Sequence, residues 1–472
     1  MTTQIDPAPS GSAPPRATSP RSTTGSGWFR AFWRWHFYAS FLVAPVLLVL
    51  AVTGLIYLFR FQLEPLIHAD LMKVEAPSAT SIQQPYANQL AAVERELPDA
   101  TVVSMAEPRS EGRSTVFSVT MPDESVRDVF VNPYGAEVLG SLDPDTTLSG
   151  YAVRIHAELM AGTWGDRLIE LAVCWAIVMA VTGYYLFWKG RKARARQKKV
   201  LRTRHAQIGV VAGVGLLMLL VSGLPWTGFW GARAQELATD RGTSMWSLDH
   251  GAISDPTSTL DESLPHSHAT DVPWAQGATE VPRSGEPTGE EGERSVSNVD
   301  TAIAVADGEG LRHPMTVALP EDDGGVFSVI GYAFDAPSDE RTVHVDQYGG
   351  GVVSTYGFED YPTLAKVVAH GIGLHEGRSF GYWSMAGSTL MCLLVIASCV
   401  TGPLMWWRRR PSGSIGAPRG RMPLRGTPVL LVGLVALGIL LPFFGISVLV
   451  VLLLDQLVVR RVPALAGRLN TS

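Results

Sequence analysis

Two parts of the chain repeat the same residues at the same spacings. His36 and His205 each lie 17 residues before a small hydroxyl residue followed by glycine, at Thr53-Gly54 and Ser222-Gly223. After His156 and His375, the same residue types follow at offsets of 6, 8, 26, 27 and 32: Gly162 and Gly381, Trp164 and Trp383, Thr182-Gly183 and Thr401-Gly402, Trp188 and Trp407. So many fixed offsets indicate an internal duplication, and a repeat constrains the fold more than any single motif.

The repeated segments are apolar enough to cross a membrane. Of the 472 residues, 46% are hydrophobic and only 17% are charged. Uncharged stretches at about 37–59, 171–188, 206–230 and 379–407 each reach the roughly 20 residues needed to span the hydrocarbon core. Four spans are therefore expected, with the apolar Cys174, Cys392 and Cys399 segments lying inside the bundle.

The distribution of basic residues predicts the orientation of these spans. Arg30 and Arg34 precede the first span, residues 189–204 hold nine Lys and Arg, and residues 408–425 hold six. None of these segments contains an acidic residue, so the positive-inside rule places them, and the N-terminus, in the cytoplasm. Residues 60–155 and 231–370 are then external.

The last apolar stretch, from Pro428 to Leu454, is long for one span and short for two. Pro442 and Gly445 lie near its middle and favour a break in the helix. A single crossing would also place Arg460 and Arg461 outside the cell. A hydrophobic hairpin that returns to the cytoplasm is expected.

Both external regions contain a strand-like segment that turns at Asn or Asp and Gly, at residues 129–138 and 343–352. Another strand candidate precedes each of them, at 114–120 and 325–331, and these share Phe-Ser-Val. Two β-hairpins, each in a small α+β module, are predicted. An insert at 247–300, rich in Ser, Thr, Pro, Gly and Glu, is expected to be a disordered loop, and His266 and His268 within it are read as linker residues.

The four repeated histidines predict two haem sites. Two halves of the same orientation are related by an axis along the membrane normal, so equivalent residues lie at equal depth. His36 and His205 then meet near the cytoplasmic side, and His156 and His375 meet near the external side. Two facing imidazoles can supply both axial ligands of a haem iron, which suits electron transfer. His370 is an alternative external ligand, because it follows Tyr348 by the same 22 residues that separate His156 from Tyr134.

Further residues fit such sites. Gly54 and Gly223 lie 17 or 18 residues beyond a histidine, about 27 Å along a helix, where small residues would admit a macrocycle or a neighbouring helix. Arg154 and Arg378 lie within three residues of external ligand candidates and could pair with haem propionates. A copper or zinc site is the main chemical rival, but no additional Cys, Met or carboxylate set repeats between the halves.

Residues 28–455 resemble proteins with PepSY modules and PepSY-associated transmembrane helices, with residues 374–381 and 405–410 as the most specific segments. That family includes bacterial iron-regulated membrane proteins and inner-membrane ferrisiderophore reductases. The resemblance implies a protein of the bacterial cytoplasmic membrane with two haem b, which reduces a ferric siderophore or other ferric chelate outside the cell. The sequence lacks a dinucleotide-binding fingerprint, so the donor would be a quinol or a separate flavoprotein.

The alternative function is a non-redox membrane scaffold whose modules bind an external partner such as a peptidase. A nucleic-acid partner is not expected for either function. The fold expected for both is an α-helical four-span bundle made of 2+2 duplicated helices, with two external PepSY-like α+β modules and a C-terminal hydrophobic hairpin.

The predicted domain layout follows the chain in this order: disordered leader 1–27, first span 28–60, first external module 61–150, interfacial segment and second span 151–189, basic loop 190–204, third span 205–230, second external module 231–370, fourth span 371–410, cytoplasmic loop 411–426, C-terminal hairpin 427–458 and cytoplasmic tail 459–472.

Overall fold

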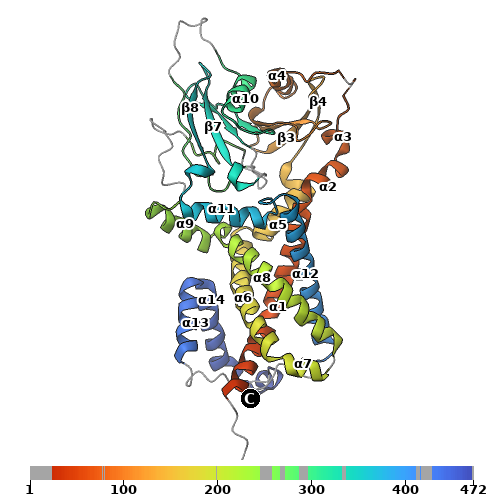
Figure 1. The fold of residues 1–472 in the computed structure, drawn as a ribbon, viewed down its shortest axis with the longest axis vertical. Coiled ribbons are helices and arrows are strands. Elements are labelled where there is room, and N and C mark those ends of the chain that lie inside the picture. The colour runs from red at the N-terminus through yellow and green to blue at the C-terminus, as the bar shows by residue number, and fades with distance from the viewer. Residues whose placement is uncertain are drawn as a thin grey trace, which may run out of the picture.

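The structure, a computed structural model, divides into a helical bundle and a β-sheet domain at one end of it (Figure 1). It describes residues 24–76, 78, 80–197, 199–244, 258–265, 272–285, 296–331, 336–410, 415 and 428–469. His266 and His268 lie outside the described residues. Within the described part, five helices are long and apolar enough to cross a membrane: Gly27–Leu58, Gly162–Lys189, Val200–Trp226, Tyr382–Trp407 and Pro442–Val459.

Four of the spanning helices form the bundle: α1 (Thr24–Leu58), α6 (Gly162–Lys189), α8 (Val200–Gly223) and α12 (Tyr382–Trp407). Both α1 and α8 pack against α6 and α12, which closes the ring of helices. Val43, Cys174, Leu220 and Cys392 lie in the core between them. The apolar helices are those of a multi-pass membrane protein.

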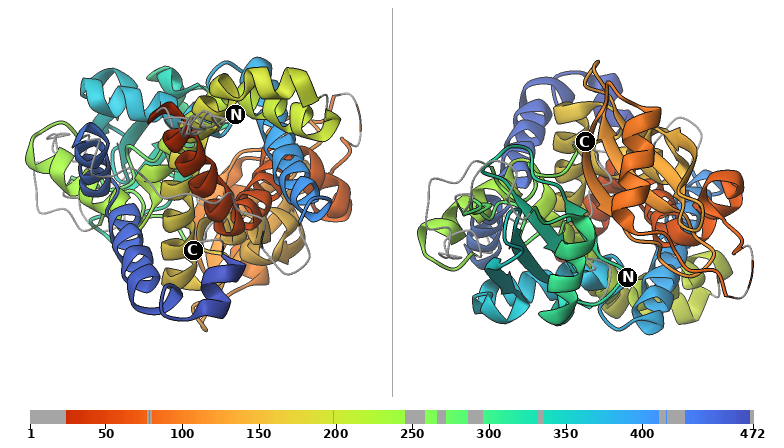
Figure 2. Two further views of the ribbon diagram at one scale, coloured as in Figure 1. Left: turned by 90° about the horizontal axis from the view of Figure 1, so that it is seen from below. Right: turned by 90° about the horizontal axis from the view of Figure 1, so that it is seen from above.

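One antiparallel sheet forms the other domain, with strands β1 (Thr101–Ala106), β2 (Thr115–Thr120), β3 (Val126–Asn132), β4 (Glu137–Leu142), β5 (Thr316–Ala318), β6 (Val326–Ile330), β7 (Arg341–Asp346) and β8 (Val352–Gly357). Their order is β4-β3-β2-β1-β5-β6-β7-β8, so each half runs outward from a central β1–β5 pair. The right-hand view of Figure 2 shows the two halves side by side. Helices α4 (Tyr86–Glu96) and α10 (Val299–Gly308) pack against the sheet and share its core.

Both expected hairpins are present, as β3–β4 and β7–β8. The register shifts at the same point in each, between Phe130 and Val131 and between His344 and Val345. A β-bulge at equivalent positions turns both strands in the same way. The two external regions, expected as separate modules, therefore share one continuous sheet through β1 and β5.

The insert at 247–300 differs from the expected disordered loop. Residues 258–265 and 272–285 are ordered, and Leu260 and Val281 are buried with Val326 and Ile330 of β6. Every residue of β6 is buried, so this strand needs cover on both faces. The few apolar residues of the insert supply that cover, and composition alone does not identify them.

Short helices lie between the bundle and the sheet: α5 (Leu148–Glu158), α9 (Trp230–Asp240) and α11 (Thr363–His375), visible across the middle of Figure 1. His156 and His375 belong to the last turns of α5 and α11 and not to the spans that follow. After α5, Leu159 and Met160 have positive φ, and after α11, Gly377 and Gly381 do. These left-handed residues end each short helix before its span begins.

The C-terminal stretch forms two helices, α13 (Pro428–Leu440) and α14 (Pro442–Leu454), which pack together beside the bundle (Figure 1). The chain turns at Leu441, and Gly438 and Gly445 allow the two backbones to approach closely. Trp175 of α6 donates a hydrogen bond to Ser447, which ties α14 to the bundle. The remaining helices are α2 (Arg60–Ile67), α3 (Ala69–Met72), α7 (Arg191–Gln197) and α15 (Pro463–Arg468).

Candidate functional site

The structure brings His156 and His375 together at the sheet end of the bundle. Their ring centroids are 6.2 Å apart, and the ring planes are nearly perpendicular, at 87°. Two imidazoles that bind one metal from opposite sides, through nitrogens at about 2.0 Å, hold their centroids about 6 Å apart. The observed separation therefore fits two ligands of a single metal atom.

His36 and His205 form a second pair toward the other end of the bundle. His36 lies on α1 and His205 near the start of α8, and the two imidazoles are close enough to interact electrostatically. The structure thus places the four repeated histidines as two pairs, one toward each end of the bundle.

Each imidazole packs against a glycine of a neighbouring helix. A Cβ added to that glycine would lie 3.3 to 3.6 Å from the imidazole Cε1, in the pairs Gly54 with His156, Gly183 with His36, Gly223 with His375 and Gly402 with His205. At the three contacts of 3.3 Å an added Cβ would crowd the ring, and at Gly402 it would touch the ring at 3.6 Å, so that a larger side chain would be needed to crowd it. The glycines of the repeated hydroxyl-Gly dipeptides therefore seat the histidines.

At three of the four histidines, the hydroxyl residue beside the glycine also contacts the ring. Nδ1 of His156 is 3.0 Å from Thr53 Oγ1, and that hydroxyl donates its proton to the carbonyl of Val49. With the Thr53 hydroxyl donating to that carbonyl, its oxygen accepts from Nδ1–H of His156. In this tautomer Nε2 of His156 carries the lone pair.

His375 and His205 have the same arrangement, and His36 has a carbonyl in place of the hydroxyl. Ser222 accepts from His375 at 3.0 Å and donates to a carbonyl of its own helix. Thr401 does the same for His205 at 3.1 Å. His36 donates directly to the carbonyl of Met179 at 3.1 Å. Metal-binding histidines usually donate their second ring N–H in this way, which orients the ring and leaves the other nitrogen to ligate.

The outer pair is also uncharged at neutral pH. Burial lowers the pKa of His156 to about 4, and the neighbouring His375 lowers it further. Burial likewise lowers the pKa of His375 to about 4. The neutral imidazole is the form that binds a metal. Charge and tautomer therefore both leave Nε2 available in this pair.

The remaining candidate residues differ in their surroundings. The His370 ring packs on Phe358, with centroids 5.1 Å apart, and the ring near His156 is that of His375. Arg378 is bound by Glu340 at 3.0 Å and Glu376 at 2.6 Å. The guanidinium of Arg378, which the sequence suggested as a partner for a haem propionate, is therefore already paired with these two carboxylates.

Arg154 is the better-placed cation for an anionic group near the outer pair. Its Nε is buried and has no hydrogen-bond partner among the described residues. A buried donor without a partner is costly, so such a group commonly serves a ligand. It lies two residues before His156, on the same short helix α5.

Sequence reasoning did not identify Trp226, whose ring lies 5.7 Å from that of His375. Its position just after α8 gave no signal, because the contact depends on how α8 meets α11. The described residues contain no group of three or more His, Cys, Asp and Glu side chains suited to a metal ion.

The comparisons with known proteins agree with this architecture. A family model described as the PepSY-associated TM region matches residues 33–409. The chain belongs to this family. It is thus a membrane protein of the PepSY-associated TM type, and the match includes all four repeated histidines. No match was found among curated proteins.

Proposed function

We propose that this protein is a transmembrane oxidoreductase of the bacterial cytoplasmic membrane that holds two haem b and reduces ferric chelates, such as ferric siderophores, outside the cell. The main support is the shared placement of four imidazoles, each with Nδ1 held by a hydrogen bond to a hydroxyl or carbonyl oxygen, which suits Nε2 for ligation. The haems would be of b type because the sequence has no C-x-x-C-H attachment motif. A haem held by two imidazoles supplies one-electron transfer with no coordination position left for oxygen.

The ligand assignments follow from the pairs of histidines. His156 and His375 would hold the outer haem, and His36 and His205 the inner one. Arg154 would neutralise a propionate of the outer haem with its unpartnered Nε. The metal-like spacing of the outer pair and the four seating glycines fit these assignments.

The topology we propose has four spans from a 2+2 duplication, α1 with α6 and α8 with α12, and a C-terminal hairpin beside them. Equivalent β-bulges and equivalent glycine–histidine contacts in the two halves support this duplication. The basic segments 189–204 and 408–425 support an orientation with the N-terminus in the cytoplasm and the sheet outside. The donor would be a quinol or a separate flavoprotein on the other side.

The test is the cofactor content and activity of the purified protein. We expect a pyridine haemochrome assay to give about two haem b per chain, with the spectrum of low-spin, six-coordinate iron. Reduced protein in proteoliposomes should be reoxidised by an external ferric chelate, and ferrozine should trap the Fe(II) formed. A colourless protein would support the scaffold function instead. Two haems without ferric reduction would leave the protein a haem protein with another acceptor.

The seating glycines give a separate prediction. Gly223→Val and Gly54→Val should each lower the haem content from about two to about one per chain, because the new side chain collides with the imidazole of His375 or His156. The haemochrome assay measures this loss. Retention of one haem shows that the bundle still folds.

Gly209→Val and Gly387→Val are the matched controls. Gly209 lies on α8, the helix that carries Gly223, and Gly387 lies on α12; an added Cβ at either position would meet nothing within 4 Å. Like the test variants, both controls replace a glycine of a spanning helix with valine. Equal haem loss in controls and test variants would refute the seating role of Gly54 and Gly223.

A further inference from the structure

A groove of about 590 Å³ lies beside the outer histidine pair. Its lining includes Trp226 and Thr227 after α8, Gln235, Glu236 and Asp240 on α9, and Trp274 from the insert. This volume is within the range of small-molecule sites, roughly 300–1,000 Å³. The groove is open to its surroundings and not enclosed, so a bulky ligand could enter it.

Trp226 joins the groove to the proposed haem ligand. One side of this residue lines the groove, and its ring lies 5.7 Å from that of His375. A molecule in the groove is therefore separated from His375 by a single aromatic side chain.

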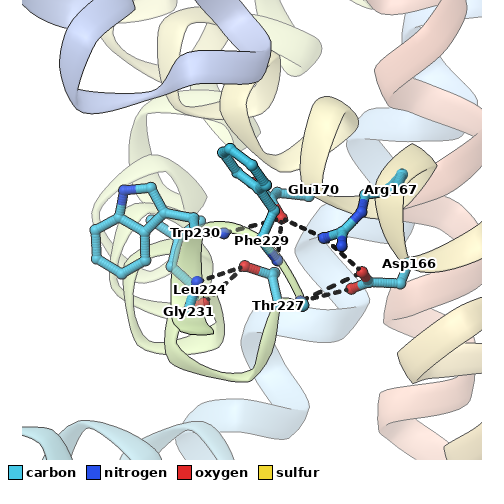
Figure 3. Close-up of polar contacts among 9 residues, drawn as sticks. Asp166, Arg167, Glu170, Leu224, Thr227, Phe229, Trp230 and Gly231 are labelled. Atoms are coloured by element: carbon cyan, nitrogen blue, oxygen red, sulfur yellow. Dashed lines mark hydrogen bonds and ion pairs between the residues drawn. The ribbon is translucent and has the colours of Figure 1, made fainter. Parts of the chain in front are cut away.

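The segment between α8 and α9, which follows Trp226, is held by hydrogen bonds to α6 (Figure 3). Asp166 accepts a hydrogen bond from the backbone N–H of Gly228 at 3.1 Å. Glu170, which is fully buried, accepts from the backbone N–H groups of Phe229 and Trp230 at 3.2 and 3.3 Å. Thr227 accepts from Gly231 N–H at 3.2 Å. These bonds fix the start of α9, so the groove exists without a ligand to shape it.

The charge of the lining has one sign. Glu236 and Asp240 contribute carboxylates, and the described lining contains no Lys, Arg or His. Two cations lie nearby but outside the lining: Arg233 of α9 lies over the Phe229 ring, and Arg241, which follows α9, donates to the carbonyl of Leu237. Two aromatic side chains beside two carboxylates attract a cation and repel an anion.

We propose that this groove docks the ferric chelate and selects it by charge, accepting cationic and neutral chelates and rejecting anionic ones. The inference rests on the proposed function. The reaction it serves is Fe(III) + e⁻ → Fe(II), with the electron taken from the reduced protein.

Three chelates of equal coordination chemistry test the charge selection. Desferrioxamine B binds iron or gallium as a complex with a free ammonium group and net positive charge, its N-acetyl form is neutral, and its N-succinyl form is negative. Gallium(III) complexes have the same charges but are not reduced, so titration calorimetry with the full-length protein measures docking independently of activity. We expect binding of the cationic complex to be about tenfold tighter than that of the anionic one at low salt.

Variants that remove the two carboxylates test whether they cause the charge preference. Glu236→Gln with Asp240→Asn should reduce the preference for the cationic complex about tenfold and leave the neutral complex unchanged. Trp274→Ala should weaken all three complexes. The control is Glu94→Gln with Glu96→Gln, which changes the net charge equally on exposed positions of α4 far from the groove. It should keep the wild-type preference.

The outcomes separate this inference from the proposed function. Equal binding of cationic and anionic complexes, or a preference that survives Glu236→Gln with Asp240→Asn, overturns the docking site even when ferric reduction is observed. Charge-selective binding of gallium complexes without any reduction of the ferric forms supports the groove and overturns the reductase function.

Discussion

His375→Ala is expected to lower the haem content from about two to about one per chain and to reduce external ferric reduction to background. The variant removes one of two facing imidazoles 6.2 Å apart, and the truncated side chain leaves no nitrogen on that side. His156→Ala should have the same effect. Haemochrome assays and ferrozine trapping in proteoliposomes measure both quantities.

His370→Ala is the matched control, because it removes an imidazole from the same helix α11. Its ring packs on Phe358 and is not seated by a hydroxyl-Gly dipeptide. Both haems and most of the activity should remain. If His370→Ala loses the outer haem and His375→Ala keeps it, our assignment of the external ligand is wrong.

His36→Ala or His205→Ala should stop electron transfer across the membrane while leaving the outer haem in place. The inner pair lies toward the opposite end of the bundle, about 27 Å from the outer level along the helices, so the outer haem alone cannot receive electrons from the cytoplasmic side. The measurement uses proteoliposomes in which the sheet domain faces outward and dithionite is enclosed. External Fe(II) should form with the wild-type protein, and its formation should fall to background with either variant.

The same preparations contain their control. Dithionite added outside should still reduce the remaining haem in both variants, which shows that the outer site is intact. Unchanged transmembrane reduction after loss of the inner haem would contradict a path through both pairs of histidines.

Most of the candidate site could be predicted from the repeat itself. Fixed offsets identified the four histidines and the hydroxyl-Gly dipeptides as related sets. They did not reveal which dipeptide serves which histidine, since Thr53 and His156 are 103 residues apart and meet only because α1 packs on α5. The ion pair of Glu340 with Arg378 could not be predicted either, because it too depends on how distant segments pack.

The fold was predictable where the signal is local. Both hairpins follow from alternating β-branched residues around a turn, and the bundle follows from long apolar runs. The central β1–β5 pair joins strands more than 200 residues apart, and no local pattern encodes it. The ordered parts of the insert were missed because a few apolar residues, such as Leu260, are enough to cover β6.

The central β1–β5 pair has a consequence for how such a chain could arise. The pair is antiparallel, with Met105 opposite Val317, and β4 and β8 are the only free edges of the described sheet. A polypeptide of half this length would expose the edge of β1, and a second copy could cover it through a two-fold, self-complementary contact. Fusion of two such genes would preserve every contact of that dimer while letting each copy diverge. Such divergence would allow the second half alone to gain the long insert, which contributes Trp274 to the groove.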